Sequence, residues 1–97
     1  MEYGGCVYIM TNKKNGVLYT GVTSNLKKRV LEHKQNFHSN SFTAKYNCHL
    51  LVYFYSFTRI EFAIAEEKRI KGGNRATKIK LIETQNPTWE DLFERLL

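Results

Sequence analysis

The sequence predicts a mixed α/β fold of the α+β kind, with a small three-stranded, mainly antiparallel sheet flanked by helices. Three observations predict it. Two β-branched and aromatic segments near the start of the chain are separated by turn-forming residues, which is typical of a hairpin. A third such segment lies at 48–57. Apolar residues recur at helical spacing elsewhere along the chain.

The hairpin is predicted from strands over residues 6–10 and 17–22. The intervening residues 11–16 are rich in Asn, Lys and Gly, which favour a loop. Asn15 and Gly16 suit positive φ angles near its tip.

A first helix is predicted over about 25–35, with apolar marks that include Leu26 and Val30. Ser24 or Thr23 can cap it by accepting a bond from a free backbone N–H. The polar and basic segment 36–47 indicates mostly loop, with at most one short helical turn.

A second long helix is predicted over about 59–71, because Thr58 and Glu61 fit a capping box. Gly72 and Gly73 end it, and Asn74 can cap a third helix to about residue 84. Pro87 ends that segment and Thr88 is expected to cap a last helix. Its apolar stripe would be Trp89, Leu92, Phe93 and Leu96.

Length and composition favour one basic domain over residues 1–97. The apolar content of 42% allows a packed core. Fifteen Lys and Arg against nine Asp and Glu give a formal charge of +6, which attracts polyanions such as nucleic acid but also serves solubility. No apolar run suits a membrane span. Cys6 and Cys48 are far apart and fit no CxxC spacing, and no leader is recognisable, so we expect reduced thiols in the cytoplasm.

Three ionisable residues fall on helical stripes that should face the core. Arg29 and His33 lie in the row of Leu26 and Val30 on the first helix, and Glu67 lies between Ile64 and Ile70 on the second. Burying an unpaired carboxylate costs several kcal/mol. Glu67 could also lie at an exposed edge or form a salt bridge with Arg29, and His33 could simply be packed.

The hairpin adds a second pattern. Cys6-Val7-Tyr8 stands on its first strand and Tyr19-Thr20-Gly21 on its second, with the tyrosines eleven positions apart. Together with residues 25–33, 65–71 and 86–89, this order resembles small, single-domain bacterial members of the GIY-YIG nuclease family. The chain departs from that pattern where Cys-Val and Thr replace the name-giving Gly-Ile and Ile, and at Gly72-Gly73-Asn74, where an aromatic is common.

The resemblance implies a metal-dependent endonuclease. Glu67 would bind one divalent ion, Mg²⁺ or Mn²⁺, and Arg29 would bind the scissile phosphate. Tyr8 and Tyr19 would flank the attacking water, with His33 tuning or receiving the proton. We favour Tyr8 as the general base, which requires a neighbour that lowers its pKa.

Basic side chains are candidates for sequence-independent contacts with phosphates. They are Lys27, Lys28, Lys34, Lys45, Lys71, Arg75, Lys78 and Lys80. The family pattern adds Gly21 as a substrate contact.

The sequence therefore predicts an endonuclease that hydrolyses phosphodiester bonds in DNA, in repair or recombination. The alternative is a nucleic-acid-binding module with little or no catalysis that works with a partner protein. A plain structural protein would leave the ionisable stripe residues unexplained.

Overall fold

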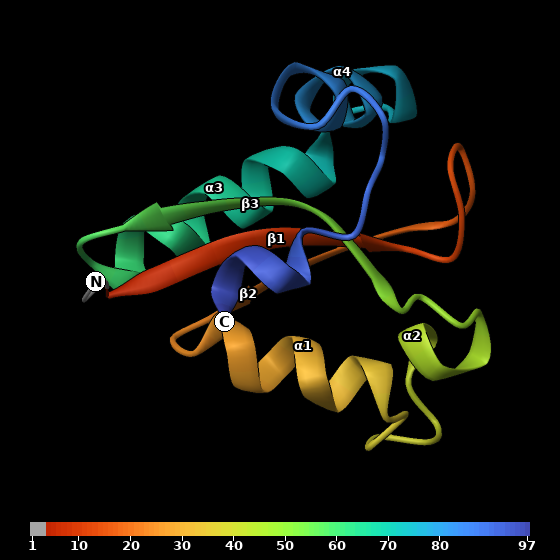
Figure 1. Ribbon diagram of the computed structural model, residues 1–97. Coiled ribbons are helices and arrows are strands. Elements are labelled where there is room, and N and C mark those ends of the chain that lie inside the picture. Colours follow the sequence, from red (N-terminus) through yellow and green to blue (C-terminus); the bar gives the residue numbers. More distant parts are fainter. Residues whose placement is uncertain (1–3) are drawn as a thin grey trace.

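The computed structural model describes residues 4–97. Its three strands are β1 (Gly5–Thr11), β2 (Leu18–Thr23) and β3 (Leu50–Phe57). They form one sheet in the order β2-β1-β3, and both pairs are antiparallel. The predicted α+β fold is confirmed, with β1 in the centre (Figure 1).

The hairpin between β1 and β2 forms as predicted. Asn15 has a positive φ of 59° at its tip, and Asn12 Oδ1 accepts a bond of 2.9 Å from the backbone N–H of Val17. The register places Met10 opposite Tyr19 and Tyr8 opposite Gly21. Because alternate strand residues share a face, both tyrosines lie on the same side of the sheet.

Helices cover both faces of the sheet (Figure 1). They are α1 (Leu26–Lys34), α2 (Phe42–Lys45), α3 (Ile60–Gly72), α4 (Arg75–Gln85) and a short 3₁₀ helix, η1 (Leu92–Leu96). α1 and η1 lie on one face, and α3 and α4 on the other. No helix within residues 4–97 is long and apolar enough to cross a membrane.

Every residue of β1 is buried, because packed elements cover both faces of this strand. Tyr8 and Met10 pack against Leu26 and Val30 of α1. The alternate residues Val7 and Ile9 pack in the core that holds α3 and α4. The central strand therefore presents Tyr8 to α1 and an apolar surface to the opposite layer.

Three predicted helix caps are wrong, and the first two are those of α1 and α3. Asn25, rather than Ser24 or Thr23, caps α1, since its side chain accepts a bond from the Lys28 N–H; Thr23 Oγ1 instead accepts from the Asn25 N–H at 3.0 Å. At α3, Arg59 rather than Thr58 is the N-cap, and it makes no side-chain cap bond.

The expected capping box does not form, because with Arg59 as N-cap Glu61 lies only two residues after the cap; its carboxylate instead accepts from Arg59 Nε at 2.8 Å. The cap predicted at Asn74 is confirmed, since its Oδ1 accepts from the Thr77 N–H at 2.8 Å.

The last helix is shorter than predicted, and Thr88 does not cap it. η1 begins at Leu92, with Asp91 as its N-cap. Trp89 lies outside it with a φ of 58°, and its indole N–H donates to Glu83 at 2.8 Å. Leu92 is buried and Phe93 and Leu96 pack partly against the same core, so these three members of the stripe do face the sheet.

The C-terminal part of the chain covers the outer edge of β3. The side-chain amide of Gln85 accepts from the Phe54 N–H at 3.1 Å and donates to the Phe54 carbonyl at 2.8 Å. Asn86 donates to the Val52 carbonyl. Side chains thus take the backbone bonds that an unprotected edge strand offers to another chain.

Candidate active site

Tyr8 and Tyr19 are held side by side by the hairpin. Their ring centroids are 6.2 Å apart. Tyr8, on the central strand, has no exposed surface, whereas Tyr19, on the outer strand, is partly exposed. Only Tyr19 therefore presents its phenol to a molecule that approaches from solvent.

Gly21 leaves the room that Tyr8 needs. A Cβ atom at this position would lie 2.5 Å from both Cζ and the hydroxyl oxygen of Tyr8, which no side chain tolerates without a shift. Packing against the phenol of Tyr8 thus explains why residue 21 is a glycine. A contact between Gly21 and substrate stays a prediction.

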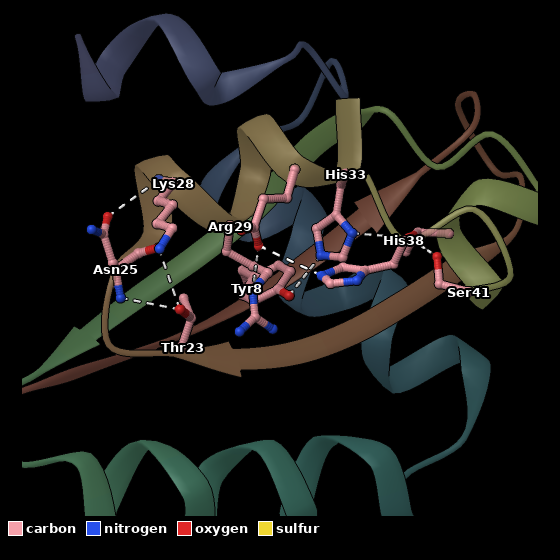
Figure 2. Close-up of polar contacts among 10 residues, drawn as sticks. Tyr8, Thr23, Asn25, Lys28, Arg29, His33, His38 and Ser41 are labelled. Atoms are coloured by element: carbon pink, nitrogen blue, oxygen red, sulfur yellow. Dashed lines mark hydrogen bonds and ion pairs between the residues drawn. The ribbon is translucent and has the colours of Figure 1, made fainter. Parts of the chain in front are cut away.

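The helix α1 brings His33 to the two tyrosines. Tyr8 Oη and His33 Nε2 are 2.8 Å apart, and the centroids of the His33 and Tyr19 rings are 5.5 Å apart. The other ring nitrogen, Nδ1, lies 2.9 Å from Thr43 Oγ1. Both nitrogens of this buried imidazole are therefore hydrogen-bonded (Figure 2).

Burial, with the nearby charge of Arg29, lowers the pKa of His33 to about 4. At neutral pH the imidazole is thus uncharged and has one N–H. With that proton on Nδ1, the ring donates to Thr43, and Nε2 accepts the bond from the Tyr8 hydroxyl.

Burial raises the pKa of Tyr8 well above its ordinary value, Tyr19 adds to this, and the charge of Arg29 only partly opposes it. The expectation that neighbours lower this pKa is wrong. Tyr8 is therefore a neutral phenol at neutral pH, and its role as general base stays a prediction.

Arg29 extends from α1 toward the hydroxyl of Tyr8, with which it interacts. Its Nε lies 3.3 Å from Glu32 Oε1, and its side chain is 40% exposed. The helical spacing predicted Arg29 as part of the buried stripe. Arg29 instead lies at the margin of that stripe. Figure 2 shows Tyr8, Arg29 and His33 together beneath α1.

Two polar partners of this group were not predicted as site residues. Glu32 holds Arg29 and also lies 3.9 Å from His38. Thr43, in α2, is 2% exposed and bonds to His33. The position of Glu32 three residues after Arg29 was a usable signal. Thr43 carries no such signal, because a loop brings it to the imidazole.

Glu67 lies on α3, on the other side of the sheet from α1. Its carboxylate is 3.0 Å from Lys71 Nζ and its side chain is 15% exposed. The near-buried position was predicted correctly, but the alternative salt bridge to Arg29 is not formed. Lys71 in turn lines a hollow with Tyr19 and Thr20. Four of the five expected catalytic residues thus interact directly, whereas Glu67 is tied to the hollow only by its salt bridge to Lys71.

The suitability of Glu67 for a metal follows from its chemistry. Within residues 4–97, no three His, Cys, Asp or Glu side chains gather as a metal cluster. Mg²⁺ needs no such cage, because it keeps several waters and is held by one or two carboxylates with substrate phosphates. Lys71 pairs with Oε2 of Glu67, so a divalent ion at this carboxylate would bind beside the lysine or displace it.

The predicted basic contacts differ in their surroundings. Lys27 and Lys28 are exposed on α1, and Lys71 and Lys78 line the hollow beside Tyr19. Arg75 instead donates to the backbone carbonyls of Asn15 and Gly16, both at 2.7 Å. It therefore fastens α4 to the hairpin, and its predicted contact with substrate stays a prediction.

A family model supports the assignment that this geometry indicates. An antiparallel sheet with two adjoining phenols, a guanidinium and a neutral imidazole is suited to phosphate chemistry. The model of the GIY-YIG catalytic domain matches residues 4–80. The chain belongs to the GIY-YIG family, a family of nucleases. Searches of curated proteins and of solved structures gave no match.

Proposed function

We propose that this chain, over residues 1–97, is one nuclease domain that hydrolyses phosphodiester bonds in DNA with a divalent metal ion, in repair or recombination. The observation that supports this most is the contact of Tyr8 with His33 beside Arg29, in a chain of a nuclease family. Cys6 and Cys48 are unpaired thiols, which suits the reducing cytoplasm, the compartment that we propose.

Arg29 would bind the scissile phosphate. Its forked donors match two phosphate oxygens. Glu32 forms a salt bridge with Nε of Arg29. Because this salt bridge already restricts the guanidinium, phosphate binding would cost less conformational entropy. Arg29 would then oppose the negative charge that develops on the phosphoryl oxygens.

Tyr19, Tyr8 and His33 would form the path for the proton. Tyr19 is the phenol that water can reach, and its hydroxyl interacts with that of Tyr8. As the water oxygen bonds to phosphorus and the leaving oxygen departs, the water proton passes to Tyr19. The Tyr19 proton passes to Tyr8, and the Tyr8 proton to His33 Nε2. An uncharged imidazole is required for this step.

Glu67 would hold the divalent ion, Mg²⁺ or Mn²⁺. When bound, the ion supplies positive charge that stabilises the leaving oxygen and the non-bridging oxygens. Lys27, Lys28, Lys71 and Lys78 would contact the DNA backbone in a way that does not depend on base sequence.

Cleavage assays test the proposal. Purified protein is incubated with supercoiled plasmid and with duplex, flap, junction and single-stranded oligonucleotides, with Mg²⁺, Mn²⁺ or a chelator. We expect metal-dependent cleavage that is lost in Glu67→Gln and Arg29→Ala. The matched control is Glu61→Gln, on the same helix and 59% exposed, which should cleave normally.

No cleavage of any substrate by folded protein would overturn the proposal. Salt-sensitive DNA binding that needs the lysines but tolerates Glu67→Gln and Tyr8→Phe would then identify a binding module that acts with a partner protein.

A further inference from the structure

Large aromatic side chains are exposed on and near α2. Phe37, Phe42 and Tyr46 are 67%, 45% and 38% exposed. Exposed aromatics that gather on one short segment are uncommon in a small domain and mark a surface for binding.

Two of these aromatics continue the row of rings that begins in the site. The Phe42 ring is stacked on Tyr19, with centroids 6.0 Å apart and an interplanar angle of 29°. Tyr46 follows, with its centroid 4.7 Å from that of Phe42. The rings thus lead from the buried Tyr8 through Tyr19 to the surface.

The row borders a hollow of about 300 Å³ that also contains positive charge. Leu18, Tyr19, Thr20, Phe42, Lys71 and Lys78 line it. Lys45 lies beside the outer end of the row, with its Nζ 5.3 Å from the centroid of the Tyr46 ring. Aromatic faces next to flexible cations are the combination that binds single-stranded nucleic acid, where bases stack on the rings and cations follow the phosphates.

We propose that Phe42 and Tyr46 stack on an unpaired base of a DNA strand while Lys71 and Lys78 bind the adjoining phosphates. In a duplex the faces of each base are covered by its neighbours, so this contact requires a single strand, an overhang or an extruded base. The preferred substrate is therefore DNA with an unpaired nucleotide next to the bond that is cut. This inference rests on the proposed function, because the base site adjoins the phosphate site.

Binding measurements in a chelator, where cleavage does not interfere, test the inference. Fluorescence anisotropy would compare a labelled oligothymidine with a duplex of equal length. A strand carrying 2-aminopurine would report stacking by a loss of its fluorescence. We expect tighter binding to the single strand and quenching of the probe.

Variants assign the contact to these rings. Phe42→Ala and Tyr46→Ala should each weaken binding to the single strand by about 5-fold to 100-fold, change duplex binding less, and restore the fluorescence of the probe. Phe42→Trp should retain both signals. Phe62→Ala is the matched control, because Phe62 is an exposed aromatic, 56% accessible, on α3.

Tyr46→Ala also separates the inference from a change in Tyr19, because Tyr46 contacts the Phe42 ring at a tilt of 50°, whereas Phe42 is the ring that stacks on Tyr19. Equal binding to single strand and duplex, or unchanged binding in both alanine variants, would overturn the inference. Metal-dependent cleavage of duplex DNA by such variants would leave the proposed function standing. Quenching of the probe without any cleavage would support the base-binding site and overturn the proposed nuclease activity.

Discussion

The hydroxyl of Tyr8 lies 2.8 Å from Nε2 of His33, and both side chains are buried. Since the imidazole is uncharged at neutral pH, the tautomer with its proton on Nδ1 leaves Nε2 to accept a bond from the phenol. This arrangement gives the fold a dependence on pH and gives the proposed chemistry a route for its proton.

We expect the free energy of unfolding to fall as the pH is lowered from about 6.5 to about 4. The pKa of His33 is about 4 in the folded protein, against an ordinary 6.5. In this range the unfolded chain binds a proton that the folded chain excludes. The stability that His33 contributes is therefore fully present above its ordinary pKa, and it is lost as the pH falls toward the lowered pKa. It should amount to about 1–2 kcal/mol between roughly pH 7 and pH 5.

Urea denaturation followed by circular dichroism measures this dependence. His33→Gln should flatten the slope. His38→Gln, a histidine with a side chain 59% exposed, should keep the slope of the parent protein. Equal slopes in the parent and in His33→Gln would contradict the assignment.

Removing the Tyr8 hydroxyl should interrupt the proposed proton path and leave DNA binding intact. Tyr8→Phe keeps the ring that packs against α1, so we expect the single-turnover cleavage rate to fall by about 10²–10⁴ at unchanged affinity. Tyr55→Phe, at a side chain 55% exposed, serves as the control. A rate near that of the parent protein would exclude Tyr8 from the path.

Adding one methyl group at Gly21 should destabilise the fold. The new Cβ would meet the Tyr8 ring and hydroxyl at 2.5 Å, and overpacking of this kind costs about 1–3 kcal/mol. Thermal unfolding of Gly21→Ala measures the loss. Gly72→Ala is the control, since a Cβ there meets no atom within 4 Å; it should unfold at the same or a slightly higher temperature. A Gly21→Ala protein as stable as this control would show that Tyr8 can move aside.

Replacing Gln85 should uncover the edge of β3. Gln85→Ala removes both bonds to the Phe54 backbone, so we expect a loss of about 1–2 kcal/mol and self-association that grows with concentration. Sedimentation velocity detects the association. Thr84→Ala removes only a bond to Lys80 in the same helix, and it should remain like the parent. A monomeric Gln85→Ala protein would mean that the edge is protected by other contacts.

Local patterns predicted the fold well where the cause is local. Turn residues predict the hairpin. Asn74 is predictable as a cap because the side chain of an Asn before a helix accepts from a free backbone N–H in the first turn of that helix. Trp89 lies outside the predicted helix because side-chain contacts, one of them with a distant strand, fix this part of the chain. Its indole bonds to Glu83, and the adjacent loop is held by Asn86, which donates to Val52 on β3.

The site was predictable to a similar extent. Helical spacing brought Arg29 and His33 to one face, and the hairpin register brought Tyr19 to that of Tyr8. The direction of the Tyr8 pKa was mispredicted, because burial outweighs the nearby guanidinium, and burial on a central strand is a property of the whole fold. Thr43 was missed for the same reason, since only the path of the loop brings it to His33.

One imidazole ring joins the chemistry to the segment that carries the aromatic row. Its two nitrogens hold the phenol of β1 on one side and Thr43 of α2 on the other. A change at Thr43 would therefore reach Tyr8 through the ring without altering Phe42 or Tyr46 themselves. Thr43 directly follows Phe42 in α2, so the imidazole ties the position of this helix to that of the buried phenol.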